Sequence, residues 1–434
     1  MENVVNTTLM RHLELHNLLS PHQFGFRKRR SAPDLLTSIG HDWRTCIEAG
    51  GTVRVLAVDV AGAFDKVSHL GVLHKLMAYG VNGSLHQWLS NYLSSRQLQA
   101  VVGGAVSAAF PISAGVPQGS ILGPTLFLVY VNDAVEALPQ SVTPATYADD
   151  TTLYSLIPSA DAVLPRCTAL QAGTDALSEW GSTWRVKFES SKSQAMSISR
   201  HHQQWPVAPL EFGGVFVEEV TSLKLLGVTF DNKLSFSYHL RSVALRAAQR
   251  IGFLRKACAI LDRPGRLRAY KGFVRPIMEY SPLVWCSAPA SYLGRLDKVQ
   301  RRALALIGHG SYVDSLQLRR TVYGLCMLFK LVCHPRLPYL ESLLPSPKVT
   351  TSARTRRQRR AANGHLHQLS NSLSSHSSTA LRRTFPYFLL DTWNSLPESI
   401  LPEKPLITHL QAFKTSAYLH LRRMDWNWAT QTYP

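Results

Sequence analysis

The chain has 434 residues, 45% of them hydrophobic, which is enough for a buried core and for two or three domains. Its formal net charge of +19 at pH 7 favours a polyanionic partner, and nucleic acid is the first candidate. A cationic protein of the membrane surface is the alternative. However, the sequence has no strongly basic amphipathic helix, and its apolar run at 121–131 is too short to span a membrane.

The six cysteines, at positions 46, 167, 258, 286, 326 and 333, form no Cys-x-x-Cys pair. Cys333-His334 has no further partners at zinc-finger spacing. This pattern favours a reduced intracellular protein without a structural zinc. Glu2, Arg11 and Glu14 argue against a signal peptide, so we expect the chain to begin directly in a helix.

The first predicted element is this helix, because Val5, Leu9 and Leu13 fall on one helical face. A basic segment with two aromatic residues follows at 22–31. It is either a solvated loop or a contact for phosphate or nucleic acid, and the residues alone leave both interpretations open. The apolar run 53–60 then indicates a buried strand. Its Asp59 would be costly unless it is paired, hydrogen-bonded or bound to a cation.

The next part of the chain is predicted to alternate between helices and short strands. In chain order we expect a helix from about Ser68, an amphipathic helix at 85–92, strands at 98–103 and 108–112, a glycine-flanked loop at 115–120 and an apolar helix to about 137. Pro124 falls in the first turns of the last helix, where proline is tolerated.

A tight β-hairpin is predicted at 145–154, because β-branched and aromatic residues flank Asp149 and Asp150. Two adjacent carboxylates repel each other, and a sequence that needed only a turn would more often use Asn-Gly. A solvated acidic turn is one interpretation. A divalent cation site is the other, since Mg²⁺ takes oxygen ligands and is usually held by one or two carboxylates plus substrate phosphates.

The remainder of the chain is predicted to become helical and more basic. We expect a helix at 170–184, strands at 194–199 and 223–230, and helices at 238–261, 265–279 and 291–308. Residues 346–384 are rich in Ser, Arg and His and have the composition of a linker or tail. Residues 385–421 are expected to be ordered again.

Three carboxylates fit one chemistry if the buried strand and the hairpin pair in one sheet. Asp59, Asp149 and Asp150 would then converge on a site for two metal ions, which clamp the attacking and leaving oxygens in phosphoryl transfer. The positive charge of the chain would hold a template and a primer.

At these residues the sequence resembles the reverse transcriptases of non-LTR retrotransposons. The resemblance is strong over about residues 3–235 and weak at 275–280 and 393–397. Its blocks occur in the family's order: HQFGFRKRRS (22–31), VDVAGAFDKV (58–67), SAGVPQGSILGPTLF (113–127), YADDTT (147–152), 180–196 with Lys192, and LKLLGVTF (223–230).

The resemblance implies an α+β fold, the right-hand polymerase, in which an antiparallel palm sheet backed by helices is followed by a helical thumb. It implies four parts: partial fingers and palm at 1–235, a helical thumb-like region at 236–345, a basic linker at 346–384 and a small helical segment at 385–434. Family members carry a fingers segment with an Arg-Pro-Ile-type motif ahead of the opening helix, so the chain is expected to be N-terminally truncated.

The resemblance also implies site residues. Asp59, Asp149 and Asp150 would bind two Mg²⁺ ions, with Mn²⁺ as a substitute, and Lys192 would act as the general acid toward pyrophosphate. Phe64 would be the steric gate that excludes a ribose 2′-hydroxyl. The alternative for Phe64 is a plain core residue, and the alternative for Lys192 is a solvated residue at the start of a strand. Asp65 is expected to stabilise the turn.

Further residues are implied to contact the substrates. Gln118 and Gly119 would contact the incoming nucleotide and template, although Gln118 could serve the loop conformation alone. The other implied contacts are Arg27 and Arg29 with the nucleotide, Tyr147 and Ala148 with the primer end, and Arg356, Arg357, Arg359 and Arg360 with nucleic acid. Glu189 departs from the family, which usually has Asn there.

The implied activity is that of an RNA-directed DNA polymerase in retrotransposition. Its partners would be an RNA template, a DNA primer or target and deoxynucleoside triphosphates, with no membrane contact. The alternative is a catalytically inactive nucleic-acid-binding remnant of a retrotransposon.

Overall fold

We describe a computed structural model, which covers residues 1–200, 208–308, 313–333, 340, 343–346, 369–370, 373, 379–401 and 407–423. The chain forms two compact units. Unit 1 consists of Met1–Leu35 and Gly50–Leu223, and unit 2 of Leu36–Ala49 and Lys224–Pro434. The four-part division expected from the sequence stays a prediction. The arginines at 356–360 lie outside the described residues.

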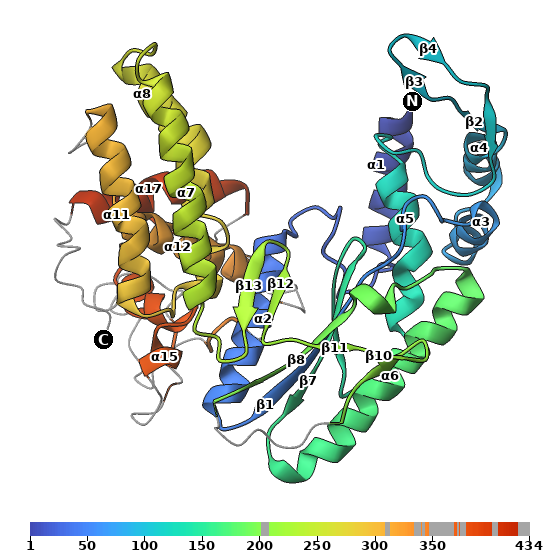
Figure 1. The fold of residues 1–434 in the computed structure, drawn as a ribbon, viewed down its shortest axis with the longest axis horizontal. Coiled ribbons are helices and arrows are strands. Elements are labelled where there is room, and N and C mark those ends of the chain that lie inside the picture. Colours follow the sequence, from blue (N-terminus) through green and yellow to red (C-terminus); the bar gives the residue numbers. More distant parts are fainter. Residues whose placement is uncertain are drawn as a thin grey trace. The chain divides into compact units, whose positions relative to one another are not determined.

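Unit 1 is built on a five-stranded sheet with the order β11-β8-β1-β7-β6 (Figure 1). The strands are β1 (Thr52–Val58), β6 (Thr143–Tyr147), β7 (Asp150–Ile157), β8 (Gln194–Ser199) and β11 (Glu218–Glu219). All neighbouring pairs are antiparallel except β11 with β8. The apolar sequence of β1 follows from its central position, where it pairs with β7 on one side and β8 on the other.

The helix α6 (Val163–Trp184) covers one face of this sheet (Figure 1). Leu170 and Leu177 of α6 pack in one cluster with Leu56 and Val58 of β1 and with Leu153 of β7. Side chains alternate between the two faces of a strand. Ala57, between Leu56 and Val58, therefore points to the opposite face, and so does the residue after Val58. This alternation decides where Asp59 is presented.

A second apolar cluster joins the other helices of unit 1. These are α1 (Glu2–Leu15), α3 (His69–Ala78), α4 (Gly83–Leu93) and α5 (Gly123–Val131), with the 3-10 helix η1 (Asn132–Val135) after α5. Leu13, Leu76, Leu89 and Phe127 are among its fully buried members. Nearly every residue of α5 is buried, which explains its unbroken apolar sequence, and Pro124 lies in its first turn as predicted.

Short two-stranded ribbons hold the other strands that the structure describes. They pair β2 (Arg96–Leu98) with β5 (Phe110–Ile112), β3 (Val101–Val102) with β4 (Ala105–Val106), β9 (Glu211–Phe212) with β10 (Val215–Phe216), and β12 (Ser222–Leu225) with β13 (Val228–Asp231). The prediction of one strand at 223–230 is therefore wrong. Leu226 and Gly227 both have positive φ, 45° and 88°, and turn the chain into a hairpin.

Unit 2 is mainly helical in its described part, as predicted. Its helices are most of α2 (Ala32–Glu48), α7 (Ser237–Ala257), α8 (Arg263–Ala269), α9 (Arg275–Met278), α10 (Pro282–Trp285), α11 (Ala290–Ile307), α12 (Leu316–Cys333), α15 (Thr379–Arg382), α16 (Leu390–Asn394) and α17 (Leu410–Arg423). Two short 3-10 helices, η5 (Tyr387–Leu389) and η6 (Ile407–His409), precede α16 and α17.

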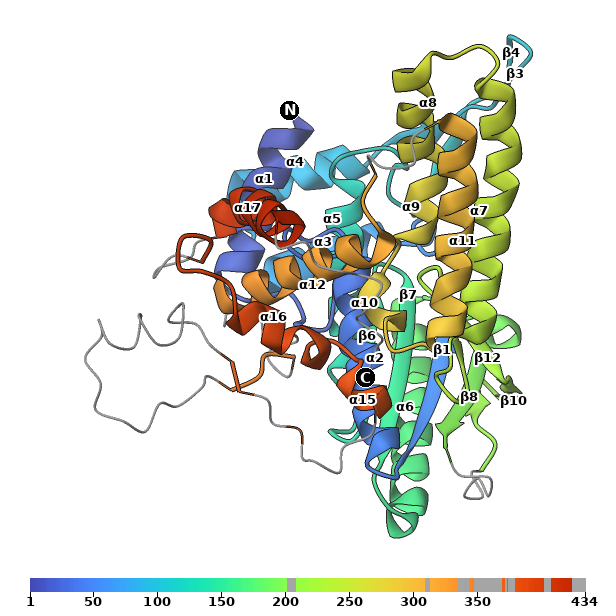
Figure 2. The ribbon, with the colours of Figure 1, turned by 90° about the vertical axis from the view of Figure 1, so that its left-hand side faces the viewer.

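The long helices α7 and α11 lie side by side, as two views show (Figures 1 and 2). The predicted helix at 265–279 is interrupted by a π-helical turn, η4 (Tyr270–Val274). Pro276 follows closely and cannot donate a helical hydrogen bond, which accounts for the local change of winding. Around α12 and α17 a separate core forms, in which Phe329 stacks on Phe413 at 4.4 Å between ring centroids.

Together the units confirm the α+β fold class expected from the sequence. Within the ranges the structure covers, no helix is both long and apolar enough to cross a membrane.

Candidate active site

The strand and the hairpin that carry the three predicted carboxylates are neighbours in the sheet. Val58, the last residue of β1, pairs with Thr151 of β7. The antiparallel register therefore brings the next residue, Asp59, opposite Asp150, the first residue of β7. Because Leu56 and Val58 pack toward α6, Asp59 lies on the other face of the sheet. Paired residues share a face, so Asp150 is presented on the same side.

The predicted hairpin is confirmed, and its turn is two residues long. Tyr147 pairs with Asp150, which leaves Ala148 and Asp149 as the turn. Ala148 has φ of 58° and is buried, while Asp149 is half-buried. A positive φ at the first turn position suits the tight connections that match the twist of paired strands. The turn places Asp149 directly before Asp150, the residue opposite Asp59.

The carboxylates influence one another electrostatically. Burial and the neighbouring charges of Asp149 and Asp59 raise the pKa of Asp150. Lys192 partly offsets this charge, because its Nζ lies 3.8 Å from Oδ2 of Asp59. The lysine side chain is 68% exposed and that of Asp59 47% exposed, so the ion pair is weak and the lysine can turn toward another anion.

The donor set suits a hard divalent cation by its chemistry. In the ranges that the structure covers, no three His, Cys, Asp or Glu side chains are gathered closely enough to form a ready-made metal cage. Mg²⁺ does not require one, since it is usually held by one or two carboxylates together with substrate phosphates. Asp59, Asp149 and Asp150 therefore fit a metal that binds together with the substrate.

Phe64 lies in the loop after β1 with one ring face against the core. Its ring stacks on Phe127 at 4.4 Å and meets the ring of Phe26 edge-on at 6.0 Å. Phe127 is buried and Phe26 is 49% exposed, so Phe64 spans from the core to the surface. The ring therefore packs in part as a core residue, and its role as a gate stays a prediction.

The glycine-flanked loop docks on the backbone around Phe64. The amide of Val116 donates to the Phe64 carbonyl at 2.9 Å, and that of Gly115 to the Val67 carbonyl at 2.8 Å. The Gln118 side chain donates to Oδ1 of Asp65 at 2.8 Å. Asp65 thus ties the turn to the loop, as expected, and Gln118 and Gly119 stay exposed beside it.

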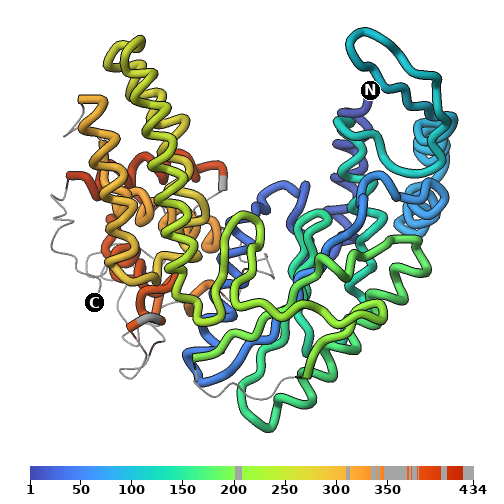
Figure 3. The backbone as a smooth tube through the Cα atoms, in the orientation of Figure 1, coloured from blue at the N-terminus to red at the C-terminus, as the bar shows by residue number. Residues whose placement is uncertain are grey.

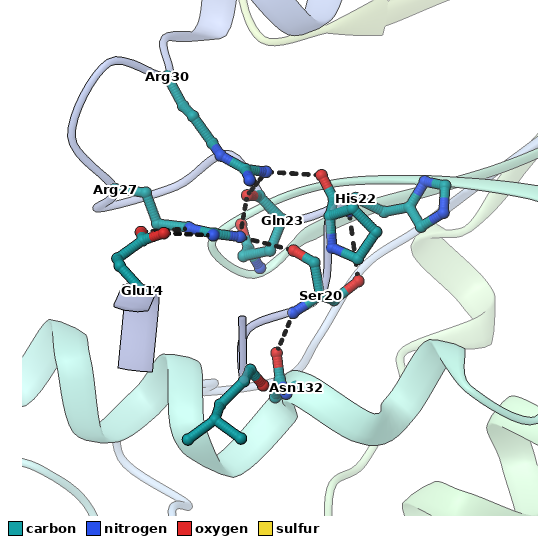
Figure 4. Close-up of polar contacts among 9 residues, drawn as sticks. Glu14, Ser20, His22, Gln23, Arg27, Arg30 and Asn132 are labelled. Carbon is teal, nitrogen blue, oxygen red and sulfur yellow. Dashed lines mark hydrogen bonds and ion pairs between the residues drawn. The ribbon is translucent and has the colours of Figure 1, made fainter. Parts of the chain in front are cut away.

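The two arginines predicted to bind the nucleotide differ in burial, and Figure 4 shows the contacts of the buried one, Arg27. The Arg27 side chain is only 3% exposed, donates to both carboxylate oxygens of Glu14 at 2.7 and 2.8 Å, and reaches the Ser20 carbonyl at 2.6 Å. To bind a phosphate it would have to break these bonds, so the geometry disfavours the nucleotide-binding role predicted for Arg27. Arg29 is exposed, with φ of 65°, and remains a candidate.

Sequence reasoning did not single out two buried amides near the site. Asn132 accepts a hydrogen bond from the Ser20 amide at 2.7 Å and donates to the Leu18 carbonyl at 2.8 Å (Figure 4). Gln23 contacts the turn that carries Asp149. The only signal for Gln23 was its place inside the HQFGF block, because its contacts are far away in the chain.

Residues 2–230 match the family model described as reverse transcriptase (RNA-dependent DNA polymerase), and the chain belongs to this family. The predicted membership of the non-LTR group is confirmed by relatives from mobile elements. The RNA-directed DNA polymerase from mobile element jockey of Drosophila melanogaster is 28% identical over 392 residues, which cover 86% of this chain and 42% of the relative.

A second relative, the probable RNA-directed DNA polymerase from transposon BS of Drosophila melanogaster, is 30% identical over 308 residues, covering 67% of this chain and 33% of the relative. The chain thus spans less than half the length of these curated relatives. Among solved structures, apo telomerase from Candida tropicalis is similar with a TM-score of 0.42 and 9% sequence identity. The similarity covers 78% of this chain and 56% of that chain.

Proposed function

We propose that the chain is an RNA-directed DNA polymerase that adds deoxynucleotides to a primer 3′-OH. The observation that carries the proposal is the register that brings Asp59 opposite Asp150, with Asp149 in the adjoining turn. Membership of the reverse transcriptase family and the names of the mobile-element relatives support it.

In this proposal Asp59, Asp149 and Asp150 hold two Mg²⁺ ions, or Mn²⁺ in their place. When bound, the ions supply positive charge to the attacking and leaving oxygens of phosphoryl transfer. Lys192 is near enough to Asp59 to reach the same anionic region, and we assign it the protonation of the leaving pyrophosphate. The raised pKa of Asp150 supports a site that gains from a bound cation.

The remaining assignments concern the substrates. We assign Phe64 the exclusion of a ribose 2′-hydroxyl, and Gln118 with Gly119 contact with the nucleotide and template. Gln118 and Gly119 are exposed, and their loop is hydrogen-bonded to Asp65 and to the backbone of the half-buried Phe64. Tyr147 and Ala148 would adjoin the primer end. The net charge of +19 supports binding of an RNA template and a DNA primer, with Arg29 as one exposed contact.

A catalytically inactive nucleic-acid-binding protein is the second candidate. The net charge of +19 supports a nucleic-acid partner for it as well. The two candidates share the nucleic-acid partner and differ in chemistry.

Primer extension separates them. The full chain is incubated with an oligo(dT) primer on poly(rA), or on poly(dA) as a comparison, with deoxythymidine triphosphate and Mg²⁺. The proposal predicts extension on the RNA template that stops when the metal is chelated. Tight binding of the primer–template without extension, in either Mg²⁺ or Mn²⁺, would establish the second candidate.

A further inference from the structure

The side chain of Gln23 is hydrogen-bonded to the backbone of the turn between β6 and β7. Its Oε1 accepts from the Ala148 amide at 2.8 Å and from the Gly25 amide at 2.8 Å. Its Nε2 donates to the Ala148 carbonyl at 3.1 Å. One buried amide, 5% exposed, therefore satisfies both main-chain polar groups of the first turn residue.

The main chain around Gln23 follows the hairpin closely (Figure 3). Gln23 forms a parallel bridge with Thr146, the Phe24 amide donates to the Thr146 carbonyl at 2.9 Å, and the Thr146 amide donates to the His22 carbonyl at 3.1 Å. A Cβ on Gly25 would lie 2.3 Å from the Ala148 nitrogen. Gly25 therefore allows its segment to pack closely on the backbone of Ala148. This packing keeps the Gln23 side chain within hydrogen-bonding distance of the turn.

Gln23 is itself fixed by the arginines of the basic segment (Figure 4). Its carbonyl accepts from Nη1 of Arg30 at 2.9 Å and from Nη1 of Arg27 at 3.3 Å. Arg27 is anchored on Glu14 of α1. The segment therefore connects α1 to the hairpin turn through partly buried, charge-assisted hydrogen bonds, which are stronger than those between neutral groups.

The turn needs such support for two reasons. Ala148 is held at φ of 58°, in the left-handed region, which is unfavourable for a residue with a Cβ. Asp149 and Asp150 carry like charges at adjacent positions, and their repulsion favours any movement that separates them. A turn with these two features relaxes unless its surroundings determine its conformation.

We propose that Gln23 is a positioning residue, whose amide fixes the Ala148 turn so that the carboxylates of Asp149 and Asp150 face a common cation. This inference rests on the function proposed above. It assigns part of the basic segment to the shaping of the metal site, whereas the sequence offered only a solvated loop or a direct phosphate contact.

The test compares two glutamines that make the same pair of bonds. Gln23→Met removes the amide at similar size. Gln171→Met is the matched control, because the Gln171 side chain likewise accepts from the Glu211 amide at 2.9 Å and donates to its carbonyl at 2.8 Å, away from the carboxylates. Hydrogen exchange of a peptide over 145–152 and Mn²⁺ binding by electron paramagnetic resonance are measured on the full chain without substrates.

We expect Gln23→Met to accelerate exchange at the Ala148 amide and to weaken Mn²⁺ binding by about 10- to 100-fold, with a similar loss of kcat and little change in the Kd of the primer–template. Gln171→Met should change none of these. If Gln23→Met does not fold, Gln23→Glu replaces it, since it keeps the acceptor and loses the donor to Ala148. Unchanged exchange and Mn²⁺ binding in the folded variant would overturn the proposal. Both readouts apply equally to a chain that does not polymerise.

Discussion

Gly25 packs directly on the backbone of Ala148, the turn residue that precedes Asp149. Any side chain at residue 25 would begin within 2.3 Å of the Ala148 nitrogen, which no packed structure tolerates without movement. The turn that carries Asp149 therefore packs against a segment more than a hundred positions earlier in the chain.

Gly25→Ala should lower the free energy of unfolding of unit 1 by about 1–3 kcal/mol through overpacking, and should also reduce primer extension. Thermal unfolding and an extension assay measure the two effects. Gly252→Ala in α7 is the control, because a Cβ there meets no atom within 4 Å among the described residues. It should be neutral or slightly stabilising. Equal stability of both variants would contradict the close contact.

The ion pair between Glu14 and Arg27 should make stability depend on pH. Burial raises the pKa of the Glu14 carboxylate, but the hydrogen bond and charge of Arg27, with the charge of Arg30, lower it overall below its ordinary value of 4.5. A lowered pKa in the folded state adds stability above pH 4.5 that is lost as the pH falls through the folded-state value.

Glu14→Gln should therefore cost on the order of 1–3 kcal/mol at neutral pH, less than a fully buried pair because the Glu14 side chain is 40% exposed. Urea unfolding from pH 7 to 3 tests this, with the exposed Glu179→Gln as control. The gap between wild type and Glu14→Gln should narrow below about pH 4.5. A gap that stays constant across this range would show that the charge of Glu14 is not responsible.

Phe64→Val should relax sugar discrimination, since the smaller side chain leaves room for a 2′-hydroxyl. The ratio of kcat/KM for ribo- over deoxynucleotides is expected to rise about tenfold or more. Phe216→Val, at an exposed phenylalanine of β10, is the control and should leave the ratio unchanged. An active Phe64→Val enzyme with unchanged discrimination would limit Phe64 to packing on Phe127.

Lys192→Met should separate catalysis from stability. Because the Lys192–Asp59 pair is largely exposed, its loss should change the free energy of unfolding by less than about 1 kcal/mol. Loss of a general acid should lower kcat by about 100-fold or more and remove the basic limb of the pH–rate profile. Lys187→Met, on the same segment, should do neither. A normal kcat and pH profile for Lys192→Met would exclude the acid role.

Local patterns predicted much of the fold around the site. The apolar run before Asp59 and the residues flanking Asp149 and Asp150 specified a strand and a hairpin, and the observed register joins them. The hydrogen bonds between Gln23 and Ala148 were not predictable, because they join two segments that meet only in the folded chain. The inward position of Arg27 was not predictable either, because a run of basic residues does not reveal that one of them turns inward to Glu14.

Asp149→Asn tests most directly whether the turn between β6 and β7 holds a catalytic metal. Asp161→Asn, at an exposed carboxylate beyond the other end of β7, is the control. The measurement is the rate of Mg²⁺-dependent extension of oligo(dT) on poly(rA), with the melting temperature of each protein. We predict that Asp149→Asn melts normally and loses at least about 100-fold in rate, since a lost ligand removes several kcal/mol of charge stabilisation, while Asp161→Asn extends like wild type. Near-normal extension by Asp149→Asn would show that Asp149 does not hold a catalytic metal.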